Sequence, residues 1–193
     1  MGRAPTASLT SGKAIALFRA VNVGGRILKM EDLRQILNRL GYIEPQTLLQ
    51  SGNAVFGFEP RAGVLTAAAV EAQIEEALQT KLSLQSDVFV RSAVEWSKAI
   101  ANNPFPKQAT SDPAHLILFT LRDAPSAAVV NALQAAIKGR ETVQARDRYL
   151  YVVYPDGQGQ SKLTNTVIER GLATRGTARN WNTVLKLAAL ASA

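Results

Sequence analysis

The sequence contains no cysteine, which excludes disulfide bonds, thiolate metal sites and a cysteine nucleophile. It has a single histidine, His115, so neither a metal site of several histidines nor a Ser-His-Asp triad is expected. No apolar run approaches the roughly 20 residues that a membrane-spanning helix needs, and the first residues lack the apolar segment of a secretory signal. We therefore expect a cytoplasmic protein without a metal and without a membrane partner.

The composition is that of an ordinary globular protein with an excess of positive charge. Of its 193 residues 47% are hydrophobic and 19% are charged, which suffices for a stable core in one large domain or two small ones. The net charge of +7 arises at the two ends: residues 1–40 carry seven basic and two acidic side chains, and residues 140–193 carry eight and four. If the ends fold together, they form a positive face suited to phosphates or nucleic acid; otherwise they form a solvated basic surface.

Apolar periodicity in the first half of the chain predicts the element order β-α-β-β-α-β-α. Residues 14–21 form a short apolar run typical of a buried strand. Ser51 and Gly52 have the composition of a tight hairpin turn. Ser92 and Glu95 have the spacing of a capping box at a helix start. The remaining expected elements are helices near 30–40 and 70–78 and strands at 46–50, 53–58 and 87–91.

The second half repeats β-α-β-β-α and then ends in a helix where a fourth strand would complete the repeat. We expect strands at 115–121, 141–146 and 149–154, and helices at 126–138, at 161–171 and after Asn180. Between the halves, residues 103–113 carry three prolines, which is typical of a linker. The predicted organisation is a disordered tail at 1–13, a domain at 14–104, a linker at 105–113, and a domain with a closing helix at 114–193.

This order of elements predicts an α+β fold. Split β-α-β units favour antiparallel sheets with helices packed on one face. We therefore expect two ferredoxin-like halves of the β-α-β-β-α type.

Three segments combine backbone amides with basic side chains and are candidate anion sites. In the first, Gly24 and Gly25 follow the first strand and would let backbone amides approach a ligand closely. Arg19 and Asn22 stand nearby in the sequence. The segment lacks the third glycine of the dinucleotide-binding fingerprint, so the alternative is a plain glycine turn.

The second segment links the strand at 149–154 to the helix expected at 161–171. It resembles a phosphate-binding P-loop, but Asp156 and Ser161 occupy glycine positions and Leu163 occupies the Ser or Thr position, so that motif is rejected. What remains is a helix start capped by Ser161, with Lys162 in the first turn, where a cation is unfavourable unless an anion binds. No cofactor-binding motif is found, and we expect no cofactor.

The third segment is RGTARNWNT, residues 175–183. Asn180 is a natural N-cap for the final helix, but a cap does not account for Arg179, which places positive charge at the unfavourable end of the helix dipole. If this segment converges with Lys162 and the glycine loop, the three would form an anion pocket. The residues of the final helix that we expect to face inward are Trp181, Val184, Leu185 and Ala188.

Several stretches of the sequence resemble one bacterial family. The family catalogued as domain of unknown function 1697 has, in the same order, stretches similar to FRAVNVGG, KMEDLRQILNRLGY, TLLQSGNAVF, RSAVEW, NPFP, SKLT and GTARNWNTVLKL. The resemblance runs from about Ala14 to Leu190 and implies a two-part α+β fold with no established activity. Ala20 stands where that family usually has the glycine of R-G-x-N-V-G-G. The positions that match its signature are Arg19, Asn22, Gly24, Gly25, Gln50, Ser51, Gly52, Asn53, Lys162, Arg179, Asn180, Trp181 and Asn182.

The leading functional hypothesis is an uncharacterised protein that binds an anionic ligand: a nucleotide, a phosphate-bearing metabolite or nucleic acid. One alternative is a small enzyme that acts on a phosphorylated or carboxylated metabolite, for which no catalytic residue is identified. Another is a structural or interaction protein without a ligand, and exposed sheet edges would permit a homodimer. The expected ligand-binding residues are Arg19, Asn22, Gly24, Gly25, Ser51, Asn53, Lys162, Arg179, Asn180 and Asn182.

Overall fold

The computed structural model describes residues 8–9, 12–22, 27–50, 52–59 and 65–193. By its internal contacts the chain forms two compact units. Of the described residues, the N-terminal unit comprises those up to Ser97 together with Leu187–Ala193, and the C-terminal unit comprises Lys98–Lys186. The division falls within two helices, α3 (Ala93–Ala101) and α7 (Trp181–Ser192). The segment expected as a linker, 105–113, contains the short helix α4 (Pro106–Ser111).

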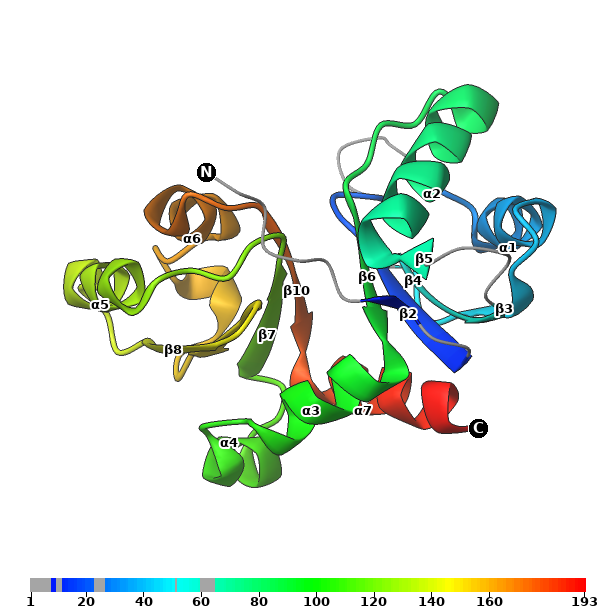
Figure 1. The fold of residues 1–193 in the computed structure, drawn as a ribbon. Coiled ribbons are helices and arrows are strands. Elements are labelled where there is room, and N and C mark those ends of the chain that lie inside the picture. The colour runs from blue at the N-terminus through cyan, green and yellow to red at the C-terminus, as the bar shows by residue number, and fades with distance from the viewer. Residues whose placement is uncertain (1–7, 10–11, 23–26, 51, 60–64) are drawn as a thin grey trace. The chain divides into compact units, whose positions relative to one another are not determined.

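The N-terminal unit is built on a four-stranded antiparallel sheet (Figure 1). Its elements are β2 (Gly12–Phe18), α1 (Met30–Arg39), β3 (Ile43–Thr47), β4 (Asn53–Phe58), α2 (Ala67–Leu82) and β6 (Val88–Ser92). The strands lie in the order β3-β4-β2-β6. Two residues of the expected tail, Ser8 and Leu9, pair as β1 with β5 (Leu65–Thr66), and Leu9 is buried.

The C-terminal unit repeats this arrangement. Its elements are β7 (Leu116–Leu121), α5 (Ala127–Ala136), β8 (Thr142–Arg146), β9 (Tyr149–Val153), α6 (Asn165–Leu172) and β10 (Gly176–Asn180). The strands lie in the order β10-β7-β9-β8, all antiparallel. In both units the first and third strands are central, and the second and fourth strands form the edges. The expected α+β fold with two ferredoxin-like halves is confirmed.

One strand of the C-terminal unit differs from the expectation. The fourth strand is present, because Gly176–Asn180 pair with β7 as β10, and the final helix begins only at Trp181. The strand was not predicted because its sequence, GTARN, is largely polar and lacks an apolar run. Thr177 and Arg179 are buried on one face, while Ala178 between them packs against the apolar core on the other.

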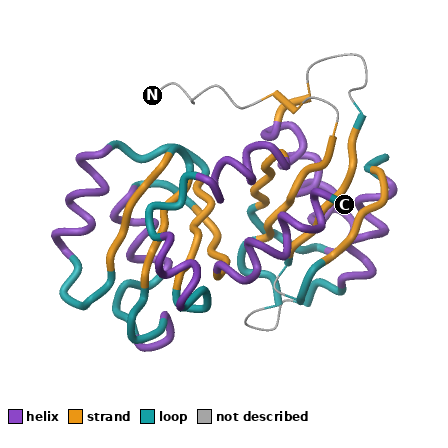
Figure 2. Tube along the Cα trace, turned by 90° about the horizontal axis from the view of Figure 1, so that it is seen from below, coloured by secondary structure: helices purple, strands orange, loops and turns teal. Residues whose placement is uncertain are grey.

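Each unit has its own apolar core between one face of the sheet and two helices (Figures 1 and 2). In the N-terminal unit α1 and α2 cover the sheet, and Leu33 and Ile74 are fully buried there. In the C-terminal unit α5 and α6 cover the sheet, with Leu133 and Ile168 in the core. The helical periodicity at 30–40, 70–78 and 126–138 therefore correctly indicated the buried faces. No helix in the described part of the chain is long and apolar enough to cross a membrane.

The free edge of β6 is closed by glutamate side chains. Alternate residues of this strand direct their N–H groups away from β2, and in an open edge strand such groups could pair with another chain. Here three of these groups donate to carboxylates. The bonds are Val88 N to Glu75 Oε1 at 2.8 Å, Val90 N to Glu71 Oε1 at 2.9 Å, and Ser92 N to Glu95 Oε2 at 3.0 Å.

Both edges of the C-terminal sheet carry similar bonds from helices. Val143 N of β8 donates to Gln134 Oε1 of α5 at 2.7 Å. Gly176 N of β10 donates to Glu169 Oε1 of α6 at 3.0 Å. Side chains of the covering helices thus tie each helix to its sheet and occupy hydrogen-bonding groups that an edge would otherwise offer.

Replacing Ala20 by glycine is expected to raise the free energy of unfolding by about 0.5–1 kcal/mol, because Ala20 has a φ of 54° in the left-handed region where glycine is unstrained. This is the position at which the family resembled by the sequence usually has glycine. Urea unfolding measures the change. Ala189→Gly in the exposed part of α7 is the control and should have the opposite sign, a loss of about 1 kcal/mol.

Candidate functional site

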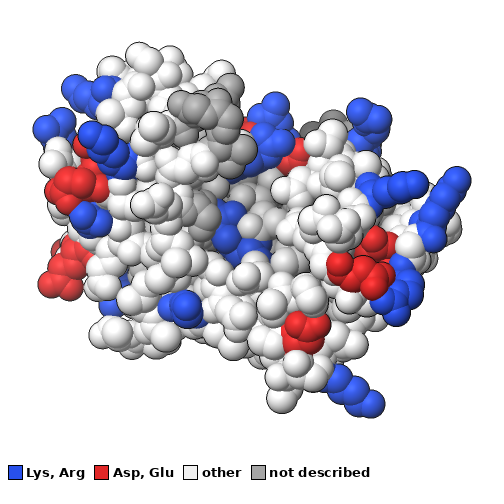
Figure 3. All heavy atoms as spheres, turned by 180° about the vertical axis from the view of Figure 1, so that it is seen from behind, with Lys and Arg blue, Asp and Glu red and all other residues white. Residues whose placement is uncertain are grey.

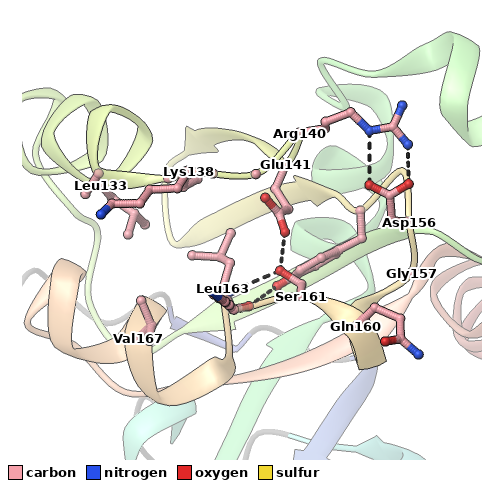
Figure 4. Close-up of a pocket in the computed structure, with 15 residues that line it drawn as sticks. Leu133, Lys138, Arg140, Glu141, Asp156, Gly157, Gln160, Ser161, Leu163 and Val167 are labelled. Atoms are coloured by element: carbon pink, nitrogen blue, oxygen red, sulfur yellow. Dashed lines mark hydrogen bonds and ion pairs between the residues drawn. The ribbon is translucent and has the colours of Figure 1, made fainter.

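A pocket of about 470 Å³ lies in the C-terminal unit, between the end of α5, the start of β8 and the segment that links β9 to α6 (Figure 4). Five charged side chains line it: Lys138, Arg140, Glu141, Asp156 and Lys162. The pairing of β8 with β9 places Thr142 opposite Val153, and this register brings the turn at 138–141 next to the turn at 156–162.

The segment between β9 and α6 folds around one buried leucine. Leu163 is only 4% exposed, its carbonyl accepts a hydrogen bond from the Tyr154 hydroxyl at 2.9 Å, and its N–H donates to Ser161 Oγ at 2.9 Å. Burial raises the pKa of Tyr154 above its usual range, so the hydroxyl stays a donor. These contacts hold residues 161–163 in a loop.

The helix expected to start at Ser161 therefore starts later, and that prediction is wrong. α6 begins at Asn165, and Thr164 is its N-cap, with Val167 N donating to Thr164 Oγ1 at 3.4 Å. Lys162 lies in the loop before the helix rather than in its first turn. The helix starts late because the backbone is extended at Ser161 (φ −81°, ψ 141°) and again at Thr164 (φ −76°, ψ 164°).

Each carboxylate of the pocket has a hydrogen-bond donor. Arg140 Nε donates to Asp156 Oδ2 at 3.0 Å, and Arg140 Nη2 donates to the second oxygen. The hydrogen bonds from Arg140 lower the pKa of Asp156 and raise that of Arg140 itself. Glu141 accepts a hydrogen bond from the Ser161 hydroxyl. These acidic groups are therefore occupied within the pocket.

Two lysines complete the lining of the pocket. Lys138 and Lys162 are both exposed. Within the described ranges, neither side chain has an ion-pair or hydrogen-bond partner. Figure 4 shows the Lys138 side chain extended alongside Leu133, away from the Arg140 and Asp156 pair. Among the described residues, the lining therefore carries two positive charges without a contact partner, and its five charged groups sum to +1.

In the N-terminal unit, three expected ligand-binding residues can be placed. Arg19 follows β2 and lies 3.6 Å from Asp87, Nη1 to Oδ2. Asn22 bonds to Leu28 in both directions: Leu28 N donates to Asn22 Oδ1 at 2.7 Å, and Asn22 Nδ2 donates to the Leu28 carbonyl at 3.1 Å. Asn53 Nδ2 donates to the Leu48 carbonyl at 2.8 Å across the hairpin. Three further expected residues, Gly24, Gly25 and Ser51, lie outside the described residues.

The stretches that follow β2 and precede β4 lie side by side. Asn22 Nδ2 donates to the Gln50 carbonyl, and Phe18 N donates to the Gly52 carbonyl at 3.0 Å. The structure thus brings the stretch FRAVN together with QSGN. The amides of Asn22 and Asn53 bond to backbone groups, which gives them a role in holding the loops.

In the C-terminal unit, Arg179 and Lys162 are not brought together. Arg179 is 9% exposed, and its Nη1 donates to Thr177 Oγ1 at 2.9 Å and to the Ala178 carbonyl at 2.7 Å. Burial lowers the pKa of Arg179 to about 10, so the guanidinium is still charged at pH 7. Ala178 and Leu163 belong to the same core, and neighbouring strand residues face opposite ways. Arg179 therefore faces away from the pocket.

The other two expected residues of this unit lie at the start of α7. Asn180 is confirmed as the N-cap: its Oδ1 accepts from Thr183 N at 3.0 Å and from Thr183 Oγ1 at 2.9 Å. Asn182 is exposed on the first turn. The prediction that Leu185 faces inward is wrong, because Leu185 is 43% exposed and Leu187 is fully buried instead.

Lys138 and Arg140 were not expected at a site. They belong to the turn Lys138-Gly139-Arg140-Glu141 between α5 and β8. The one signal for them in the sequence is this short basic cluster at a glycine turn. Its proximity to Asp156 follows from strand pairing, which local sequence does not reveal.

The described part of the chain contains no candidate metal site. No group of three His, Cys, Asp or Glu residues in those ranges could hold a metal ion. His115 instead pairs with Asp112, Nδ1 to Oδ2 at 2.7 Å, within a turn before β7.

Charges of both signs are mixed on one face of the molecule. Figure 3 shows Lys and Arg side chains separated there by neutral surface and by carboxylates. Within each unit taken by itself, the described Lys and Arg side chains visible on this face do not form a basic stripe of the kind that follows a nucleic-acid backbone.

Comparison with protein families shows to which family the chain belongs. A family described as "Protein of unknown function (DUF1697)" matches residues 12–151, which include the loops at Asn22 and Gln50 and the pocket turn at 138–141. The chain belongs to this family. The resemblance inferred from the sequence is thereby confirmed for DUF1697, whose description carries no activity.

A solved structure supports the same fold for this DUF1697 member. It is a conserved bacterial protein from Streptococcus pneumoniae, 16% identical, with a TM-score of 0.73; the match covers 95% of this chain and 100% of that one. At this identity the likeness concerns the fold alone. No curated protein matches the chain significantly.

Proposed function

We propose that the protein binds a small anionic ligand in the pocket of the C-terminal unit, with Lys138 and Lys162 supplying the positive charge. One observation carries the proposal. Glu141, Asp156 and Arg140 are already bonded within the pocket, whereas the two lysines have no partner among the described residues. An anion would gain charge-assisted hydrogen bonds from both lysines without first breaking an ion pair.

A small ligand fits these features better than nucleic acid does. A volume of about 470 Å³ is within the range typical of small-molecule sites. Nucleic-acid binding depends on many phosphate contacts along a basic surface, and the charges in Figure 3 are mixed in sign. Lys162 is retained from the expected residues, and ligand binding by the others stays a prediction.

Lys138→Ala and Lys162→Ala are each expected to weaken anion binding about tenfold, because each removes one charge-assisted hydrogen bond. The wild-type protein is first tested by thermal shift with AMP, glucose 6-phosphate, inorganic phosphate and a short oligonucleotide. A ligand at a hundred times its dissociation constant adds about 2.7 kcal/mol of stability, which such a measurement detects. Titration calorimetry then gives the affinity of each variant.

Lys107→Ala is the matched control, since Lys107 is an exposed lysine of the same unit that lies outside the pocket. Wild-type affinity in the Lys138→Ala, Lys162→Ala double variant would contradict the pocket. A response to the oligonucleotide alone, falling steeply with salt, would indicate nucleic acid instead. A protein that responds to none of the four compounds would overturn the proposal.

A further inference from the structure

We infer that the ligand of this pocket is a phosphate monoester with an apolar body, such as an aryl or alkyl phosphate, an inference that rests on the proposed function. Its basis is the combination of unpaired cations with apolar surface in one pocket. A free phosphate would use the cations only, and a sugar phosphate would place hydroxyl groups against the apolar surface.

The apolar surface comes from α5, from α6 and from the segment that links β9 to α6. Leu133 of α5 and Leu163 line the pocket and are 5% and 4% exposed. Val167 of α6 also lines it and is 43% exposed (Figure 4). A valine that is open to water on the wall of a pocket gains free energy when the apolar part of a ligand covers it.

The pocket is larger than an inorganic ion. Its volume of about 470 Å³ equals the liquid volume of roughly 15 water molecules. A single phosphate ion at the lysines would leave most of this space to water against Leu133 and Val167. A ligand with a ring or a short alkyl chain would fill it.

The two lysines favour a phosphate over a carboxylate head group. Lys138 and Lys162 have no ion-pair or hydrogen-bond partner within the described residues, and together with Arg140, Glu141 and Asp156 they give the lining a net charge of +1. A phosphate monoester presents three terminal oxygens and about 1.5 to 2 negative charges near neutral pH, so it attracts both ammonium groups more strongly than a monocarboxylate, which presents two oxygens and one charge. The Lys138 side chain runs alongside Leu133, so cationic and apolar groups lie next to each other (Figure 4).

The decisive experiment compares four probes by titration calorimetry at one ionic strength: phenyl phosphate, inorganic phosphate, glycerol 1-phosphate and benzoate. Phenyl phosphate is expected to bind at least about tenfold more tightly than each of the others, because it alone satisfies both the lysines and the apolar wall.

Val167→Thr tests the apolar wall directly. The substitution keeps the shape of the side chain but replaces a methyl group by a hydroxyl. We expect phenyl phosphate to bind about three- to tenfold more weakly and inorganic phosphate to bind unchanged. Val94→Thr is the control, since Val94 is an exposed helical valine of the N-terminal unit.

The outcomes separate this inference from the proposed function. Equal binding of the three phosphates, with no effect of Val167→Thr, would overturn the inference and leave anion binding intact. Benzoate binding as tightly as phenyl phosphate would overturn the choice of a phosphate head group. Failure of all four probes to bind would overturn both the inference and the proposed function.

Discussion

Replacing Glu71 by alanine is expected to lower the free energy of unfolding by about 3–5 kcal/mol. Glu71 lies on α2, is 4% exposed, and accepts a hydrogen bond from Val90 N at 2.9 Å. The same oxygen is 3.6 Å from Nη1 of Arg91, which is 1% exposed. Alanine would remove this carboxylate and leave the charge of Arg91 in a site that water does not reach, and that desolvation dominates the cost. Urea unfolding monitored by circular dichroism measures the loss.

Two further variants separate the charge of Glu71 from its hydrogen bond. Glu71→Gln keeps an acceptor for the Val90 N–H but removes the charge, so its loss of stability should be intermediate. Glu76 is exposed on the same helix, and Glu76→Ala should change the free energy of unfolding by less than about 0.5 kcal/mol. A loss below about 1 kcal/mol for Glu71→Ala would show that the Arg91 site is not as desolvated as the structure indicates.

The carboxylates of α2 and α3 that accept hydrogen bonds from β6 also bear on self-association. A homodimer formed by pairing of sheet edges would need outward N–H groups, and those of Val88, Val90 and Ser92 already donate to glutamates. Edge pairing through β6 would have to break these bonds first. The homodimer stays a prediction, and another surface would suit it better than this edge.

The parts of the fold that could be predicted from the sequence depend on neighbours in the chain. The capping box is one example: Ser92 N donates to Glu95 Oε2 at 3.0 Å, and Glu95 N donates to Ser92 Oγ at 3.1 Å. The hairpin of β8 and β9 is another. β10 could not be recognised, because its polar residues become strand-like only by pairing with the distant β7. Leu185 was misassigned because the packing of α7, rather than its periodicity alone, selects which residues are buried.

The candidate site was predictable only in part, because a pocket is formed by segments that meet in space. Lys162 was selected for its position at a helix start, yet it lines the pocket from a loop. Arg140 lies sixteen residues before its partner Asp156, and only the register of β8 with β9 brings them together. The pairing of Arg140 with Asp156 then leaves Lys138 available to a ligand. Local sequence does not show which of these two cations is paired.

Gly52→Ala is expected to lower the free energy of unfolding by about 2–5 kcal/mol, through overpacking and a left-handed backbone. Gly52 has a φ of 75°, and a Cβ there would lie 2.8 Å from Phe18 Cβ and closer still to Val21 Cγ2. Phe18 Cβ is attached directly to the backbone of β2, and the Phe18 side chain is buried. This atom therefore cannot move aside unless β2 shifts. Thermal and urea unfolding of the variant measure the loss.

Gly159→Ala is the control for this substitution, because a Cβ at Gly159 would meet no atom within 4 Å, and the expected change is within about 0.5 kcal/mol. The comparison also tests what the QSGN stretch does. If Gly52→Ala destabilises the protein while anion affinity of the folded variant is unchanged, the stretch holds the loops at Phe18 and Asn22 in place. If stability is unchanged and anion binding is lost, the stretch contacts ligand, and the pocket at Lys138 and Lys162 is not the whole site.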